Sequence, residues 1–343
     1  MVELKVNGEK FRGWKDVSIK RGIEFLASEF RLGITEDAPD SWPLDEGDEC
    51  VVSLDYNDIP IPVITGIIDS VDPSYDKNSH SISISGRSKT GQLVDCSEAH
   101  SVGTFYNQMP EQLATELCQP FGINVVNQCL NTGGPYNVFS VIHGEQVHEC
   151  LERISRERKF LLTDNPYGDL VFMNPSKEKI LTALIEGQNI LAASSQNKLA
   201  DRFSLMIVKS NNPRDIGVGR ADVNDTEILL YRPKVIISET PLDSAACKKR
   251  AEWEIYVRAA RAMTTTVTIQ GWAHDTGLWE PNKIVYLDSP RIRRDGEFLI
   301  TEVEYTMSKV DGSKTTLTLM PPDAFSSEPP IKIPKLPKII RHK

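Results

Sequence analysis

Side chains that could bind a metal ion fall close together near the middle of the chain: His143, His148 and Cys150. Imidazole and thiolate are the usual protein ligands of zinc, so the group raises a metal-binding hypothesis. His148 and Cys150 lie near the core side of a predicted helix, whereas His143 precedes that helix behind Gly144. The three therefore share no face with i,i+4 spacing. We interpret them as a core cysteine and two ordinary histidines, and we predict no metal site.

Two other groups could carry hydrolytic chemistry. A nucleophilic serine needs a strained turn such as GxSxG; Ser85-Gly86-Arg87-Ser88 lacks that pattern and sits at the end of a predicted strand. A glycosidase needs two carboxylates about 5 to 9.5 Å apart. Glu302 and Glu304 are candidates, but they share one strand face opposite Val303 and Tyr305, which is typical of an exposed sheet face. We predict no catalytic residues and no cofactor.

A basic cluster, Lys248–Arg250 with Arg258 and Arg261, lies on a helix predicted at about Asp243–Ala262. It could meet DNA or an acidic partner. We interpret it instead as a helix whose apolar stripe packs on a β domain while its cations face solvent or form salt bridges across a subunit interface. The predicted stripe is Ala246, Trp253, Val257 and Ala260.

Three tryptophans, Trp14, Trp272 and Trp279, lie beside glycines or in the turn-rich GLWEPN stretch. They could be platforms for sugars. Because aromatic burial dominates small β cores, we predict buried anchors.

The composition excludes several classes of protein. A chain of 343 residues exceeds one hydrophobic core, so two or more domains are expected. No apolar run approaches the ~20 residues of a membrane-spanning helix, and MVELKVNGEKFRGW lacks the apolar region of a signal peptide. A net charge of −9 argues against a general nucleic-acid binder. No CxxC pair occurs, so disulfides are not expected among Cys50, Cys96, Cys118, Cys129, Cys150 and Cys247.

The elements that must position these groups change along the chain. Residues 1–99 are predicted to form a β domain. Its turn residues include Asp72-Pro73 and Asp76 to Ser79. Serine and isoleucine alternate in the last strand, which places Ile82 and Ile84 on one buried face. The predicted strands are Leu4–Val6, Val17–Ile19, Val51–Leu54, Val63–Ile68 and Ser81–Ser85.

Residues 100–186 are predicted to form a small inserted α/β domain. One helix opens at Met109-Pro110 and closes before Gly122. A second helix, about Glu145–Arg158, carries one apolar stripe. The stripe is Val147, Cys150, Leu151 and Ile154, and a hairpin of Phe160–Leu162 and Leu170–Met173 follows.

In residues 187–325 the β character returns around the helix 243–262. The fold class is therefore α+β and mainly β: two similar antiparallel β-barrel-like domains with an inserted small α/β domain. The predicted strands are Phe203–Val208, Val235–Ile237, Thr264–Ile269, Ile284–Leu287, Phe298–Val303 and Thr315–Leu319.

An internal repeat relates the two β domains. A segment starting at Cys50 aligns with one starting at Lys283, with matching Leu-Asp, Ile-Thr, hairpin tip and alternating strand, and spacings that agree within three residues. Three copies would present six similar domains, so a threefold object could dock on a sixfold one. Because any antiparallel meander tends toward this pattern, chance similarity is the alternative. The matching pairs are Leu54-Asp55 with Leu287-Asp288, and Ile64-Thr65 with Ile300-Thr301.

Seven stretches in matching order, spread almost end to end, resemble the baseplate hubs of Mu-like phages and prophages. That family is related to other contractile-tail hubs and to the N-terminal part of the type VI secretion spike VgrG. The stretches are FRGWKDVSIKRGIE (Phe11–Glu24), TGIIDSV (Thr65–Val71), SGRSKTGQLVDC (Ser85–Cys96), DRFSLMIVK (Asp201–Lys209), YRPKVII (Tyr231–Ile237), QGWAHDTGLWEPN (Gln270–Asn282) and LMPPDAF (Leu319–Phe325).

The resemblance implies a non-enzymatic structural protein of the virion tail baseplate, assembled in the cytoplasm of the bacterial host. It implies a homotrimeric ring between the hexameric tail tube and the trimeric spike. DNA would pass through the lumen without specific binding. In that setting the net charge of −9 would keep DNA off the wall, or would only keep the surface soluble.

Other hypotheses stay open at this stage. One is a tail-associated cell-wall-degrading or carbohydrate-binding protein, and another is a DNA-contacting protein. Residues 326–343 form a basic, Pro-rich tail with an extended pattern. It could add a strand to a partner, run toward the spike or be disordered.

Overall fold

The computed structural model describes residues 1–35, 43–77, 80–99, 103–129, 131–210, 219–238 and 242–326. The chain divides into two compact units. Unit 1 comprises Met1–Ser176, Thr268–Lys283 and Ile300–Leu317, and unit 2 comprises Lys177–Val267, Ile284–Leu299 and Thr318–Lys343. Neither unit is a single run of sequence, because three strands contribute residues to both: β18 (Met263–Gln270), β22 (Arg294–Ser308) and β23 (Gly312–Met320).

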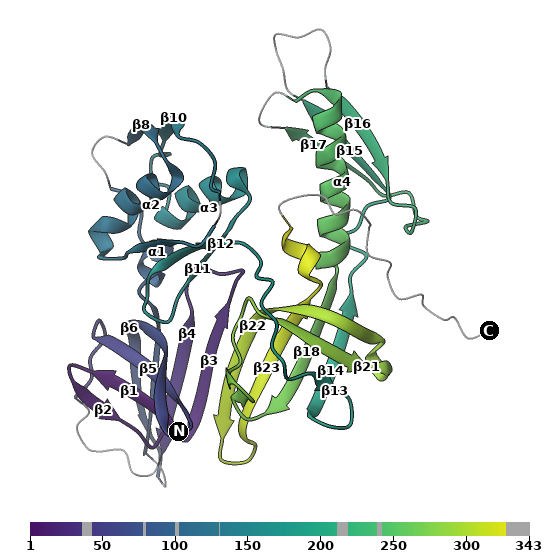
Figure 1. Ribbon diagram of the computed structural model, residues 1–343. Coiled ribbons are helices and arrows are strands. Elements are labelled where there is room, and N and C mark those ends of the chain that lie inside the picture. Colours follow the sequence, from purple (N-terminus) through teal and green to yellow (C-terminus); the bar gives the residue numbers. More distant parts are fainter. Residues whose placement is uncertain are drawn as a thin grey trace. The chain divides into compact units, whose positions relative to one another are not determined.

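Much of unit 1 is an antiparallel sheet in the order β22-β3-β4-β7-β6-β5-β1-β2 (Figure 1). The N-terminal and C-terminal parts of the chain meet in this sheet, because β3 pairs with β22 from Val17 opposite Met307 to Gly22 opposite Glu302. The remaining strands of this sheet are β1 (Val2–Val6), β2 (Glu9–Phe11), β3 (Asp16–Gly22), β4 (Glu29–Thr35), β5 (Glu49–Tyr56), β6 (Ile59–Tyr75) and β7 (His80–Ser88).

The two faces of this sheet differ because side chains alternate along each strand. Ile19, Leu32 and Ile84 are fully buried on the core face. On the outer face Ser18 lies opposite Arg31, which lies opposite Ser85. The alternation predicted for Ser81–Ser85 is confirmed.

The insert of unit 1 is built around helices α2 and α3 and a three-stranded sheet in which β12 pairs with β11 antiparallel and with β9 parallel. Apolar faces of both helices share one buried core with Phe160 and Phe172, whose rings stack at 4.4 Å. Both predicted helices and the predicted hairpin are confirmed. The elements are α1 (Gly91–Asp95), β8 (Thr104–Gln108), α2 (Pro110–Cys118), η1 (Gln119–Phe121), β9 (Val125–Asn127), β10 (Tyr136–Ser140), α3 (Val147–Arg158), β11 (Leu161–Asp164) and β12 (Leu170–Met173). A small hairpin, β19 (Ala273–His274) and β20 (Gly277–Leu278), completes unit 1.

In unit 2 a long helix, α4 (Ser244–Arg261), covers one face of the sheet β16-β15-β17 (Figure 1). Cys247, Ala251 and Ile255 of α4 pack on Met206 and Val208 of β15. The other elements are β13 (Leu184–Ile185), β14 (Ile190–Asn197), β15 (Leu205–Ser210), β16 (Arg220–Asn224), β17 (Pro233–Ser238), β21 (Ile284–Ser289), η2 (Pro290–Ile292) and η3 (Pro322–Phe325).

The repeat seen in the sequence coincides with two meanders of the same order. β5, β6 and β7 are 8, 17 and 9 residues long, and β21, β22 and β23 are 6, 15 and 9 residues long. In each, a short strand leads into a very long one and then into a strand of nine residues. The mainly β α+β class is confirmed. Barrel closure and the boundaries of domains 1–99, 100–186 and 187–325 stay predictions.

Two local predictions are wrong. Asp72-Pro73 is not a turn: β6 continues to Tyr75, with Pro73 opposite Ile82 of β7. A proline is tolerated there because β5 pairs with Ile59–Ile67, so that among the described residues β7 is the one strand paired with β6 around Pro73.

The predicted stripe of α4 is also only half right. Val257 and Ala260 are buried, but Ala246 and Trp253 are only partly covered. A single apolar stripe was predicted on the assumption that α4 packs on one surface. The helix in fact packs on β15 and β16 and also on η3. The tail 327–343 lies outside the described residues.

Candidate assembly surface

The histidine and cysteine group does not form a metal site. His143 is exposed in the loop before α3, whereas Cys150 is buried in the core of the insert. Burial, with a hydrogen bond to Glu145, raises the pKa of the Cys150 thiol to about 12, so no thiolate is available near neutral pH. Across the described ranges, no three His, Cys, Asp or Glu side chains gather closely enough to hold a metal ion.

The Ser85–Ser88 run is engaged in structural contacts. The Ser88 hydroxyl lies 2.7 Å from that of Thr90 and accepts from the Ser28 amide at 3.2 Å. Arg87 donates to Asp69 and to Asp95, each at 2.6 Å, and so ties β6, β7 and α1 together. These partners hold a strand end and its following helix, as the sequence interpretation expected.

The two glutamates of β22 are likewise held on the outer face of the sheet. Glu302 lies 3.4 Å from Lys20, and Glu304 accepts from the Ser18 hydroxyl at 3.2 Å. Both partners come from β3, so the carboxylates join the two strands.

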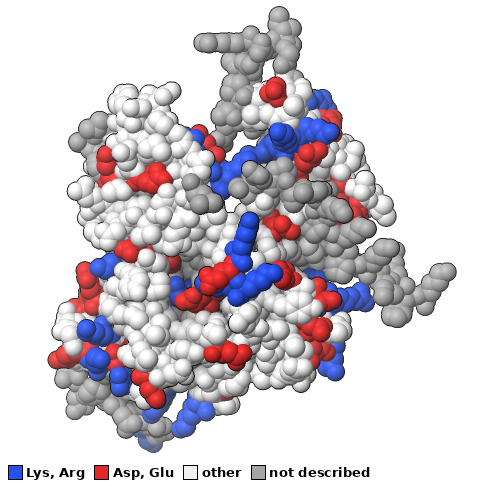
Figure 2. Space-filling view, viewed as in Figure 1, with Lys and Arg blue, Asp and Glu red and all other residues white. Residues whose placement is uncertain are grey.

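Three of the five cations of α4 lie close to the two acids of the same helix. Arg250 and Arg258 both pair with Glu254, at 2.7 and 3.1 Å, and Lys248 lies 3.9 Å from Glu252. Figure 2 shows Lys and Arg over α4 with Asp and Glu beside them.

The three tryptophans are buried, at 5%, 7% and 2% exposure for Trp14, Trp272 and Trp279, so the prediction of buried anchors is confirmed. The Trp272 indole donates to the Thr306 carbonyl at 3.0 Å, and the Tyr305 hydroxyl donates to the Trp279 carbonyl. No ring is available as a flat sugar platform, since each packs into unit 1.

With these groups assigned to structural contacts, the candidate surface for assembly is one end of the sheet of unit 1. Each step along β22-β3-β4-β7-β6 is antiparallel, so β22 and β6 run in the same direction. The hairpins β6–β7 and β22–β23 therefore project from the same end of the sheet (Figure 1). We call them the two tip hairpins.

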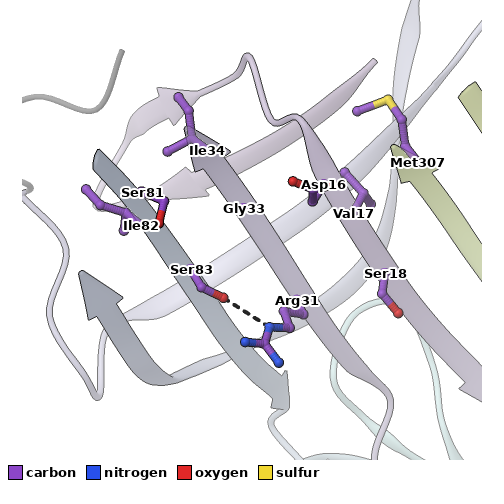
Figure 3. Close-up of a pocket in the computed structure, with 10 residues that line it drawn as sticks. All are labelled: Asp16, Val17, Ser18, Arg31, Gly33, Ile34, Ser81, Ile82, Ser83 and Met307. Atoms are coloured by element: carbon purple, nitrogen blue, oxygen red, sulfur yellow. Dashed lines mark hydrogen bonds between the residues drawn. The ribbon is translucent and has the colours of Figure 1, made fainter. Parts of the chain in front are cut away.

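A hollow of about 400 Å³ lies on the outer face of the strands between the tip hairpins (Figure 3). Gly33 is one of its lining residues, and a Cβ there would come within 3.3 Å of the Cβ of Asp16. Arg31 donates to the Ser83 hydroxyl at 3.0 Å across it. Its single carboxylate cannot supply the acid pair of a glycosidase. The lining is Asp16, Val17, Ser18, Arg31, Gly33, Ile34, Ser81, Ile82, Ser83 and Met307.

The insert is anchored to the sheet strands by a buried carboxylate at the end of β11. Asp164 accepts from the Ser28 amide at 3.1 Å and from the Ser28 hydroxyl at 2.8 Å, and Thr163 donates to the Gly22 carbonyl at 2.7 Å. Burial raises the pKa of Asp164, while Arg21 acts in the opposite direction. The contact fixes the insert within unit 1.

Sequence reasoning missed the burial of Asp164 and the exposed hydrophobic residues of the tip hairpins. Asp164 precedes Asn165-Pro166 and reads as a turn residue, with no signal of burial. The tip hairpins did carry a signal, because Tyr75 and Val310 are hydrophobic residues among charged neighbours in predicted turns.

The fold of the chain is that of a phage tail protein. The structure is similar to that of the 43 kDa tail protein of prophage MuSo2 from Shewanella oneidensis, with a TM-score of 0.85, 33% identity, and coverage of 94% of this chain and 98% of that chain. It shares its fold with the E. coli c3393 protein, described as a component of the type VI secretion system similar to T4 tail proteins gp27 and gp5. There the TM-score is 0.62 and the identity 12%, covering 97% and 80% of the two chains.

Family models match three parts of the chain: the N-terminal domain of the Mu phage baseplate assembly protein GpP-like family (residues 1–88), the second domain of baseplate hub protein gp44-like (90–174) and the fourth domain of Mu GpP (243–328). The chain is 31% identical over 340 residues to baseplate hub protein gp44 of Escherichia phage Mu, covering 94% of this chain and 88% of that protein. The chain belongs to the family of Mu-type baseplate hub proteins. The resemblance found in the sequence is confirmed, and with it a structural role in the tail baseplate. Within the described part of the chain, no helix is long and apolar enough to cross a membrane.

Proposed function

We propose that three copies of the chain close into a ring that joins the sixfold tail tube to the threefold spike. The repeated meander carries the proposal. β5–β6–β7 and β21–β22–β23 have the same order and similar lengths, so three chains supply six similar units. A ring of this kind presents near-sixfold symmetry to one partner while keeping true threefold symmetry for the other.

In this proposal residues 1–99 and 187–325 are the ring domains, and residues 100–186 are an insert held by Asp164 and Thr163. The ring is assembled in the host cytoplasm, and DNA passes through it without specific binding. The net charge of −9 supports passage without adhesion, since an acidic wall repels phosphate.

The proposal assigns no enzymatic activity to the chain. This assignment is supported by the structural contacts of the candidate catalytic groups. Ser88 accepts a hydrogen bond from a backbone amide, and Glu302 and Glu304 join β22 to β3. Purified bacterial cell wall incubated with the protein should release no soluble fragments. Release that is lost in Glu302→Gln or Glu304→Gln would contradict this assignment.

The ring is tested by the absolute mass in solution, measured by light scattering over a tenfold range of concentration. A trimer of 38.4 kDa chains has a mass of about 115 kDa. A stable mass near that value, alone or after addition of the spike protein, is expected. A monomer under both conditions would refute the ring.

A further inference from the structure

The two most exposed large hydrophobic side chains among the described residues of unit 1 lie on the two tip hairpins. Tyr75, where β6 ends, is 88% exposed, and Val310, between β22 and β23, is 93% exposed. Single exposed hydrophobic residues are common on proteins. These two differ because they occupy corresponding hairpins of the repeated meander and project from the same end of one sheet.

Described contacts flank the exposed side chain in both hairpins. In the β22–β23 hairpin the Asp311 amide donates to the Ser308 hydroxyl at 3.1 Å, and Lys314 pairs with Asp311 at 2.6 Å. In the β6–β7 hairpin the hydroxyls of Ser74 and Ser81 lie 2.9 Å apart across the strands. Contacts between neighbouring residues limit the freedom that the chain beside each anchor loses on binding, which favours the use of the two side chains as anchors.

We propose that Tyr75 and Val310 are equivalent anchors that insert into apolar sockets on the rim of a sixfold partner ring, the tail tube. The inference rests on the proposed trimer, in which three chains present six such side chains at one end. A threefold partner would contact the two hairpins of a chain with different surfaces. A sixfold ring would contact both hairpins with the same surface. An apolar residue on each corresponding hairpin therefore favours the tube over the spike.

The test compares Tyr75→Ser, Val310→Ser and the double variant with control variants at exposed sites away from the tip hairpins. Tyr167→Ser, at 68% exposure in the β11–β12 turn, is the tyrosine control. Leu229→Ser, at 97% exposure in unit 2, is the aliphatic control. The mass of each variant is measured first. Binding is then measured by co-sedimentation with assembled tubes of the tail tube protein encoded with this chain.

Each single tip variant is expected to keep the wild-type mass and to weaken tube binding about tenfold or more, as loss of one buried apolar side chain per contact does. The double variant should bind more weakly still, and both controls should bind as wild type. Wild-type binding by the double variant would overturn the inference. So would an effect of only one of the two positions, since that indicates a threefold contact.

The ring and the anchors fail separately. If the wild-type chain forms no trimer, either alone or with the spike protein, the proposed function is refuted before binding is measured. If the wild type is trimeric and the double variant is monomeric, the two side chains hold the ring together, and their role as tube anchors is refuted.

Discussion

Removal of the Asp164 carboxylate should destabilise the protein strongly. Asp164→Ala deprives the buried Ser28 hydroxyl of its acceptor, while the Ser28 amide keeps the Ser88 hydroxyl at 3.2 Å. An orphaned buried donor costs about 1–3 kcal/mol, and Arg21, only 7% exposed, loses a nearby opposite charge. Together these predict a loss of at least about 1–3 kcal/mol.

The assay is urea unfolding followed by tryptophan fluorescence, with limited proteolysis of the insert as a local probe. Asp201→Ala, at an exposed aspartate, is the control and should shift the midpoint little. A loss below about 1 kcal/mol for Asp164→Ala would refute the anchoring role, because the cost would then be that of a surface residue.

The pH dependence of Asp164 has a definite sign. Burial holds the pKa of Asp164 above the ordinary 3.8. Between pH 3.8 and the raised folded-state pKa, the folded chain therefore keeps a proton that the unfolded chain releases. This contribution to stability is complete below pH 3.8 and is lost as pH rises through the raised folded-state pKa. Asp164→Asn removes it, so the stability of the wild type relative to Asp164→Asn should fall as pH rises above about 4. A difference that is flat or rises with pH would contradict the assignment.

Two further predictions concern stability. Arg202 and Asp225, 2% and 3% exposed, pair at 2.6 Å, and Arg202 also lies 3.1 Å from Glu227. Asp225→Ala leaves Arg202 with that one acid and should cost about 1–3 kcal/mol in urea unfolding. Replacing both by apolar residues should recover most of that loss, and no recovery would contradict this account. Gly66→Ala would place a Cβ 1.9 Å from the Arg87 carbonyl oxygen and should lower the thermal midpoint sharply or prevent folding. Gly134→Ala, with open space around the new methyl, should change the midpoint little, and equal effects would show that the contact at Gly66 relaxes freely.

The local patterns predicted most elements well because each depended on neighbours in sequence. The alternation around Ile82 and Ile84 and the stripe from Val147 to Ile154 both match buried faces. The repeat predicted the two meanders, since strand order and length follow from spacing alone.

The features that could not be predicted from the sequence depend on contacts between residues far apart in the chain. The pairing of β3 with β22 and the burial of Asp164 against Ser28 need the assembled fold. The strands β14 and β16 were missed because both are rich in polar residues and show no clear alternation of apolar and polar side chains. Pro73 was assigned to a turn because its tolerance depends on which side of β6 is paired.

The junction of β3 with β22 also sets an order of events during synthesis. Ser18 and Glu304, which touch across it, are 286 residues apart in the chain. The first strands therefore leave the ribosome long before β22 is synthesised, and one edge of β3 stays unpaired until then. Contacts of such long range slow folding, because a large loop must close before they form. Completion of the sheet thus acts as a check on chain length: a truncated product lacking residues 302–307 exposes the edge of β3 and cannot present a finished surface for assembly.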